Sequence, residues 1–430
     1  MLFVTLQPIG ERRAGPAIRC WELAREVARR HEVTVASLQP SDLRDERVRV
    51  LADIPARRRE FSAAARACDI LVAQGPVFDF FPFLLRLGKY VIIDLYDPYL
   101  LENLSYSRPL ERLRYLRQLH LLNQQLLRGD FFLCASERQR DYWLGQLQAV
   151  GRLNPDHHRL DPSLRNLLEV VSFGISPEPP QHTKPALRGV VPGIGPGDFL
   201  LLWAGGLWEW FDPLTILRAL AEVSTELPAV RLVFLGTRHP NPRTPEMPIL
   251  AQTRQLARDL GLLDRVVFFN EGWVPFAERQ NYLLEADVGL SAHRETLEMR
   301  LAFRTRVLDY IWAGLPMILT AGDHFGDWAE QEQTGLTVPP GDVRGWKQAI
   351  LRLARDPDLR QRFRSRLREL APAFHWSKLA EPLVHYCDRP HHTPQSSRWL
   401  RLVLPPLVFA YRQWMNLRQG VLRLWGKDTP

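Results

Sequence analysis

The stretch MLFVTLQPIGERRAGPAIRCWELAREVARRHEVTVA (1–36) predicts a strand, a loop, a helix and a second strand. Residues 2–6 form a short apolar run, and the polar loop that follows ends at Gly15-Pro16. From residue 17 the apolar positions recur at the spacing of a helix with one buried face, and 33–36 is again strand-like. The stretch therefore predicts a βαβ unit, the building block of a parallel sheet covered by helices.

Further short strands, often separated by helical stretches, follow along the chain. They are predicted at 70–73, 90–94, 131–135 and 170–173 in the first half, and at 199–204, 230–235, 265–269, 288–291 and 316–319 in the second. A segment rich in Pro and Gly, 176–198, separates the two series and predicts a linker. We therefore expect an α/β protein with two Rossmann-like, doubly wound parallel-sheet domains facing a cleft.

The expected domain limits follow from this alternation. The first domain spans 1–178 and the second 179–372. A helix at 373–392 is expected to cross back to the first domain, and a basic amphipathic tail covers 393–430. A chain of 430 residues is too long for one ordinary core, which agrees with two domains and a tail.

The composition excludes several classes of protein. An apolar content of 46% and a charged content of 24% are typical of globular chains and exclude disordered or collagen-like ones. The four cysteines lack the paired spacing of metal or redox sites, and no Asp-x-Asp motif ends a predicted strand, so we expect no metal and no cofactor. The chain shows neither a signal-peptide pattern nor an uninterrupted run of about 18 apolar residues, which favours a cytoplasmic protein.

The net charge of +8 is concentrated at the C-terminus, where 391–430 hold six Lys or Arg and one acid. The segment WLRLVLPPLVFAYRQWMNLRQGVLRLW (399–425) sets an apolar stripe opposite basic residues. It predicts an in-plane anchor, through 399–427, on an anionic membrane such as the inner face of the plasma membrane. The alternative is a helix packed on its own protein or on a partner. No basic face stands out in 1–390, which argues against nucleic acid as a partner.

The segment AHRETLEMRLAFRTRVLDYIWAGLPMILTAGDHFG (292–326) follows a predicted strand of the second half, where parallel sheets bind ligands. It places Arg304 and Arg306 at a helix entry and Asp309 one turn further on. Arginine forks suit a diphosphate, and one carboxylate can accept from both hydroxyls of a ribose. The three residues therefore fit a nucleoside diphosphate, although they could instead pair with one another on a solvated helix face.

The run LDYIWAGLPMI (308–318), with DVGLSAH (287–293) before it, resembles the donor-site motif of family-4-type retaining glycosyltransferases of the GT-B fold. In that family a Glu, seven residues and a second Glu precede Ala-x-Ala-x-Gly-x-Pro. Asp309 stands at the second Glu, which implies a role in binding the ribose. The first Glu would fall at Leu301, so Glu298 is the nearest acid that could replace it.

The resemblance extends over most of 1–390 and implies further donor contacts. The Gly loop at Gly15 and the run VVSFGI (170–175) match the family, whereas AGGLWEWFDPLTILRAL (204–220) lacks the Arg and Lys that bind the diphosphate there. We therefore assign that task to Arg304 and Arg306. Other expected donor-side residues lie in the loops after the strands, with the base flanked by Gly272-Trp273-Val274: Gly205, Gly206, Trp208, Gly236, Gly272 and Trp273.

Two further groups of residues are candidates for the site. Asp94, Tyr96 and Asp97 end a strand of the first half and would face the acceptor, or would form a structural turn. His293 lies beside the donor loop and joins Arg304, Arg306 and Glu298 as a candidate for the catalytic centre.

Together these features predict a glycosyltransferase that moves a sugar from a nucleotide-sugar donor to a lipid-linked or cell-surface glycan, as in polysaccharide biosynthesis. The resemblance implies retention at the transferred carbon, by attack from the face of the leaving group. The alternatives are a sugar-nucleotide epimerase or a phosphorylase of the same fold, or a catalytically silent GT-B module that binds glycan or scaffolds partners. The departures at Leu301 and 208–211 keep the silent module open.

Overall fold

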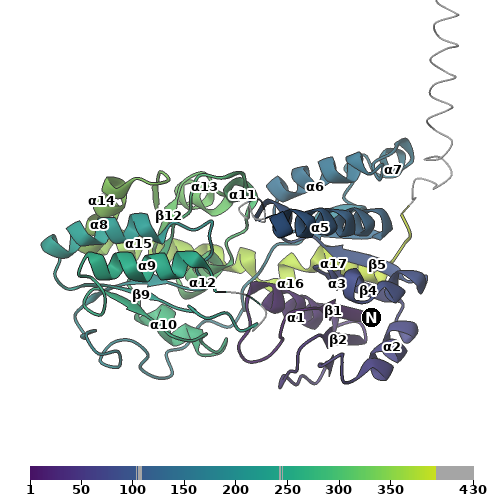
Figure 1. The fold of residues 1–430 in the computed structure, drawn as a ribbon, viewed down its shortest axis with the longest axis horizontal. Coiled ribbons are helices and arrows are strands. Elements are labelled where there is room, and N and C mark those ends of the chain that lie inside the picture. Colours follow the sequence, from purple (N-terminus) through teal and green to yellow (C-terminus); the bar gives the residue numbers. More distant parts are fainter. Residues whose placement is uncertain (103, 105–108, 242–243, 245, 394–430) are drawn as a thin grey trace, which may run out of the picture.

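The computed structural model describes residues 1–102, 104, 109–241, 244 and 246–393. Two parallel sheets lie side by side, each flanked by helices (Figure 1). This arrangement confirms the predicted pair of doubly wound α/β domains of the GT-B fold. Apart from its first residue, Thr393, the predicted amphipathic tail lies outside the described residues. Within the described part of the chain, no helix is long and apolar enough to cross a membrane.

The first sheet has seven parallel strands in the order β3-β2-β1-β4-β5-β6-β7. Its strands are β1 (Leu2–Thr5), β2 (Val33–Ser37), β3 (Val48–Leu51), β4 (Ile70–Gln74), β5 (Tyr90–Asp94), β6 (Phe131–Cys134) and β7 (Leu168–Val170). The helices of this half are α1 (Gly15–Val27), α2 (Arg58–Ala67), α3 (Val77–Phe80), the 3-10 helix η1 (Pro82–Arg86), α4 (Tyr99–Glu102), α5 (Pro109–Arg128), α6 (Glu137–Ala149) and α7 (Pro155–Leu160).

The second sheet has six parallel strands in the order β10-β9-β8-β11-β12-β13. Its strands are β8 (Phe199–Trp203), β9 (Val230–Phe234), β10 (Val267–Phe269), β11 (Val288–Ser291), β12 (Met317–Thr320) and β13 (Gly335–Val338). The helices of this half are α8 (Pro213–Glu226), α9 (Pro248–Asp259), α10 (Arg279–Glu285), α11 (Leu297–Leu301), α12 (Thr305–Ala313), α13 (His324–Gln331), α14 (Val343–Arg355) and α15 (Pro357–Leu370).

The chain then returns to the first domain through η3 (Ala371–Phe374), α16 (Trp376–Leu379) and α17 (Glu381–Asp388). The Trp376 N–H donates to the carbonyl of Ile175 at 3.2 Å, beside the point where the chain first left that domain. At the end of α17, Asp388 accepts from Arg30 and contacts His31, both at 2.8 Å. These contacts fasten the C-terminal helices to α1.

One predicted strand is displaced in the structure. The sequence predicts a strand at 170–173, but β7 ends at Val170. Phe173 is buried because it packs between the domains, 5.6 Å from the ring of Phe303 and 4.8 Å below the guanidinium of Arg19. Its apolar character therefore reflects an interdomain core and not a place in the sheet.

Tyr310 of α12 ties together the strand ends that carry the site. Its hydroxyl lies 2.8 Å from the carbonyl oxygen of Leu290 and 3.0 Å from that of Leu202, and it accepts from the N–H of Ala204 at 3.1 Å. Gly289 makes room for the ring, because a Cβ there would lie 2.7 Å from it.

We expect Tyr310→Phe to lower the free energy of unfolding by about 1–3 kcal/mol, because it leaves buried backbone groups without a partner. Tyr282→Phe, at a partly buried tyrosine of α10, is the matched control. Urea unfolding of both variants measures the difference, and equal midpoints would contradict this role for the hydroxyl.

Candidate active site

The main cleft lies where the strand order reverses in each sheet. β1 lies between β2 and β4, and β8 between β9 and β11, so the loops that follow these strands open at the two switch points. A cavity of about 420 Å³ lies between these loops and is lined by both domains. Gly15 permits their close approach, because a Cβ at this position would lie 3.3 Å from Oγ1 of Thr305.

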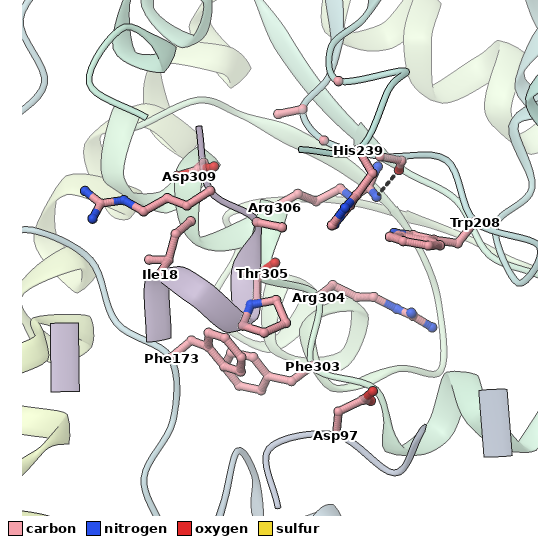
Figure 2. Close-up of a pocket in the computed structure, with 18 of the residues that line it drawn as sticks. Ile18, Asp97, Phe173, Trp208, His239, Phe303, Arg304, Thr305, Arg306 and Asp309 are labelled. Carbon is pink, nitrogen blue, oxygen red and sulfur yellow. Dashed lines mark hydrogen bonds between the residues drawn. The ribbon is translucent and has the colours of Figure 1, made fainter. Parts of the chain in front are cut away.

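Most residues predicted for the site line this cavity, although they come from seven separate segments of the chain. They are Gly15, Tyr96, Asp97, Gly205, Gly206, Trp208, Gly236, Trp273, Glu298, Arg304, Arg306 and Asp309. Gly272 lines an adjoining cavity of about 660 Å³. In Figure 2, Asp97 lies at one edge of the cavity and Trp208 and His239 lie towards the other.

Two predicted residues lie behind the cavity wall. Asp94 is buried and accepts from Arg19 at 2.9–3.0 Å and from Gln74 at 3.2 Å, so it stabilises the first domain. The His293 side chain is 1% exposed, with its ring 5.5 Å from that of Phe211. Burial lowers the pKa of His293 well below its usual value, with Arg304 and Arg306 adding to the effect. The structure therefore gives neither residue a contact with the cavity.

Arg304 and Glu298 form a buried ion pair in the cavity wall. The Arg304 Nη1 and Nη2 atoms donate to the two carboxylate oxygens at 2.7 and 2.8 Å, and both residues are about 5% exposed. Oδ2 of Asp323 lies 3.8 Å from the Arg304 Nε atom. Because two carboxylates already face it, Arg304 offers little free positive charge to a ligand.

Arg306 is in a different electrostatic position. Its guanidinium lies over Phe211 at 4.2 Å and Trp203 at 4.5 Å, and Nη2 donates to the carbonyl of Gly206 at 2.8 Å. Nη1 is buried and has no hydrogen-bond partner among the described residues, which also give Arg306 no carboxylate within ion-pair distance. Burial lowers the pKa of Arg306 to about 9, which leaves it charged at neutral pH. A buried cation with an unused donor needs an anionic partner.

Asp309 also lines the cavity, and sequence reasoning missed its partner. Nε of Arg279, the first residue of α10, donates to Asp309 Oδ1 at 2.9 Å. The Arg279 guanidinium is held over Phe276 at 3.5 Å and over Trp312 at 4.3 Å. Within the described part of the chain no hydrogen bond reaches Oδ2 of Asp309, so this oxygen can accept from a ligand hydroxyl.

Arg13 is a second cation that the sequence analysis did not select. It lies two residues before Gly15, lines the cavity, and holds its guanidinium 4.5 Å from the ring of Phe276. Its Nε and Nη1 atoms are buried without a partner among the described residues. Its carbonyl accepts from Nε1 of Trp273 at 3.2 Å, which links the two domains across the cleft. The sequence feature that could have identified Arg13 is its position in the loop that ends at Gly15.

Aromatic rings form the remaining wall of the second domain. The rings of Trp208 and Trp210 stack at 5.5 Å with planes 2° apart, and His239 lies 5.6 Å from Trp208 and 5.4 Å from Trp273. Burial lowers the pKa of His239 to about 4, so the ring is neutral. Gly236 has a φ of +75°, and a Cβ there would lie 3.1 Å from the Trp273 ring. This wall offers flat apolar faces to a base or a sugar.

Asp97 and Glu102 form an acidic pair on the first-domain side. Their carboxyl groups share a hydrogen bond. Burial, with a smaller effect of Glu298 and against the influence of Arg304, raises the pKa of Asp97 to about 7. Burial and then Asp97 raise the pKa of Glu102 well above its usual value. The pair therefore retains a proton at neutral pH.

Asp97→Asn tests this pair through the pH dependence of stability. A carboxyl group whose pKa rises from about 3.9 in the unfolded chain stabilises the fold below that pH, and this stabilisation is lost as the pH rises through the folded pKa. With the folded pKa of Asp97 near 7, we expect Asp97→Asn to raise the melting temperature more at pH 8 than at pH 5. Thermal melts at both pH values measure it, and an equal shift at the two would contradict it.

The described residues contain no group of three or more His, Cys, Asp or Glu that could hold a metal ion. The cleft therefore presents cations, carboxylates and aromatic rings as its chemically active groups. A buried cation beside a carboxylate and flat aromatic faces is suited to a nucleoside diphosphate.

Comparison with known proteins agrees with this chemistry. Residues 198–356 match the family model described as glycosyl transferases group 1. Similar solved structures include WaaG, a glycosyltransferase involved in lipopolysaccharide biosynthesis, with a TM-score of 0.63, 18% identity and coverage of 91% of this chain and 100% of that one. No curated protein sequence matches the chain.

Two other solved structures share the fold over similar lengths. Sucrose-phosphate synthase from Thermosynechococcus elongatus has a TM-score of 0.63 at 15% identity and covers 90% of this chain and 98% of its own. HepE from Anabaena, solved in complex with UDP and glucose, has a TM-score of 0.64 at 13% identity, and the match covers 90% of this chain and 99% of HepE. At these identities the likeness concerns the fold.

The two facing doubly wound domains have the GT-B fold of these glycosyltransferases. The second domain, which carries Arg306, Asp309 and the aromatic wall, matches the model of the group 1 glycosyl transferases over residues 198–356. The matched segment includes the run at 308–318 that suggested this family.

Proposed function

We propose that the enzyme transfers a sugar from a nucleoside-diphosphate donor, with retention, to a lipid-linked or cell-surface glycan. The observation that carries this proposal is the buried Arg306 in the cavity wall, whose Nη1 has no hydrogen-bond partner among the described residues. The loop 204–212 lacks its own Arg and Lys, and Arg306 brings a guanidinium to that same loop by bonding to Gly206 and packing on Phe211. A cation from α12 thus replaces those missing from the loop.

The donor is proposed to lie along the second domain. Arg306 and the backbone at Gly205 and Gly206 bind the diphosphate, with Arg13 approaching from the first domain. Asp309 accepts from the ribose, and the base packs near Trp273. HepE was solved with UDP and glucose, and a trehalose-6-phosphate structure from E. coli with UDP-2-fluoro glucose, so uridine is the first base to test.

The reaction breaks the bond between the anomeric carbon and the leaving diphosphate oxygen. The acceptor hydroxyl oxygen forms the new bond on the same face, and its proton passes to the leaving diphosphate. Negative charge grows on that diphosphate in the transition state, so a preorganised buried cation stabilises this state more than the ground state. Arg306 is proposed to supply this stabilisation.

The acceptor is proposed to enter from the side of Tyr96 and Asp97. Attachment to an anionic membrane through 399–427 remains part of the proposal and accords with an acceptor that is itself held in a membrane. Removing 396–430 should then weaken binding to anionic vesicles while leaving a folded enzyme.

A panel of nucleoside-diphosphate sugars, assayed for release of the nucleoside diphosphate, tests the proposal. We expect one donor to be hydrolysed slowly without acceptor and faster with glycolipid extracts, and Asp309→Ala to raise its KM. Conversion of a nucleotide sugar without release of the diphosphate would favour an epimerase. No turnover of any donor by folded enzyme would favour the silent module.

A further inference from the structure

A second cavity, of about 480 Å³, opens in the first domain at the carboxyl ends of β1, β4 and β5. It shares four lining residues with the donor cleft: Gln7, Tyr96, Asp97 and Tyr99. The two cavities therefore meet at the place where we put the acceptor hydroxyl. The outer end of the second cavity is lined by α3 and α5.

The polar groups on the floor of this cavity are already engaged. Gln74 accepts from Thr5 and donates to Pro16 and Asp94, and Asp94 is held by Arg19. The amide of Gln125 donates to the carbonyl of Gly75 at 2.7 Å. These groups close the floor and leave apolar side chains for a ligand: Leu6, Leu38, Phe80, Leu95 and Leu121, with the ring of Tyr99.

The rim of the cavity holds two arginines and one acid, Asp79, and so has a net positive charge. Arg114 and Arg117 of α5 both line it. Arg117 donates to Asp79 of α3 at 2.7 Å, whereas Arg114 is exposed and has no ion-pair partner within the described part of the chain. The sequence of α5 holds four arginines and one acid, so this helix carries a net positive charge. An anionic group is the complementary ligand for this rim.

Apolar side chains are exposed just outside this rim. Leu113 is 67% exposed and Leu116 is 52% exposed, both on α5, and Phe80 on α3 is 47% exposed. Leu113 and Leu116 are next to the two arginines in sequence, and Phe80 lines the cavity together with them. Three large exposed apolar side chains around two arginines form a surface that suits an amphiphile.

We infer that this cavity binds the acceptor, and that the acceptor is an amphiphile with a phosphate between its sugar and its apolar chain. The sugar hydroxyl lies at Tyr96 and Asp97, its ring packs on the apolar wall and Tyr99, and the phosphate lies at Arg114 and Arg117. The apolar chain leaves over Leu113 and Leu116. This inference rests on the proposed function and names the substrate class for the acceptor side of the same site.

Calorimetric titration of the full chain with n-octyl phosphate, below its micelle concentration, tests the inference. Octyl glucoside and inorganic phosphate separate the apolar and anionic contributions, and both should bind more weakly. We expect Arg114→Gln to weaken octyl phosphate binding about tenfold, as for one lost charged hydrogen bond. Leu121→Trp should block binding, and Arg128→Gln, on the same helix but outside the cavity, should change nothing.

Binding of a nucleoside diphosphate is measured on the same preparations. It distinguishes a failure of this inference from a failure of the proposed function. We expect Leu121→Trp to bind the nucleoside diphosphate as wild type does and to lose binding of octyl phosphate. Octyl phosphate binding that is equal in wild type, Arg114→Gln and Leu121→Trp would overturn the inference, as would octyl glucoside binding as tightly as octyl phosphate. Octyl phosphate binding that follows the variants without any nucleoside diphosphate binding would support this cavity and contradict the donor proposal alone.

Discussion

Arg306→Met is expected to lower kcat/KM for sugar transfer by about 10²–10³-fold, the cost of removing one preorganised group that stabilises developing negative charge. Methionine keeps the apolar stem that packs on Phe211 and Trp203, so the change removes charge rather than volume. The loss should fall on kcat as well as on donor binding, because the charge on the diphosphate grows in the transition state.

The stability of Arg306→Met separates a role in ligand binding from a structural one. Arg306 is buried without a carboxylate partner among the described residues, so its removal should leave the melting temperature unchanged or raise it. Arg300→Met, at an exposed arginine of α11, is the matched control for charge. Full activity of Arg306→Met, or its unfolding at the temperature of the assay, would contradict the assignment.

Unlike Arg306→Met, Arg304→Met is expected to destabilise the protein, with a loss of about 3–5 kcal/mol in the free energy of unfolding. The substitution leaves Glu298 buried, with two carboxylate oxygens that have lost their donors, and Asp323 beside it. Urea unfolding measures the loss. The pair is buried in the cavity wall, so activity alone would not separate stability from binding.

The double variant Arg304→Met/Glu298→Gln tests the coupling directly. Replacing the carboxylate by an amide removes the uncompensated charge, so the double variant should be more stable than Arg304→Met alone. Additive losses from the two substitutions would show that the ion pair is not the source of the effect. If Arg304→Met were inactive but as stable as wild type, this result would favour the role in diphosphate binding that the sequence suggested for Arg304.

The sheets of both domains could be predicted from sequence because parallel strands buried on both faces leave continuous apolar runs. The segments 199–204, 230–235 and 288–291 agree closely with β8, β9 and β11. The analysis missed β3 and β13, which lie at the edges of the two sheets and are each only four residues long. It misplaced β7 because Phe173 is apolar for interdomain packing, and this apolar residue made 170–173 resemble a strand in sequence.

The sequence brought together residues that line one cavity, but it did not predict how they pair. Strand ends and glycine loops indicated where ligands would bind, and most of the residues selected line one cavity. Sequence spacing could not separate Arg304 from Arg306, since their difference depends on Glu298 and on the aromatic rings under Arg306. Arg279 was missed because its partner Asp309 lies on another helix, and Arg13 because its ring contact, Phe276, belongs to the other domain. Glu102 was missed because its carboxyl group meets Asp97 only in the folded and buried site.

The central claim is that Arg306 of the second domain binds the diphosphate of a nucleotide-sugar donor. Isothermal titration of wild type, Arg306→Met and Arg300→Met with UDP and the other nucleoside diphosphates tests it most directly. The account predicts that one diphosphate binds wild type and Arg300→Met alike and that Arg306→Met loses it while remaining folded. Equal binding by Arg306→Met, or no binding of any nucleoside diphosphate to folded wild type, would contradict it.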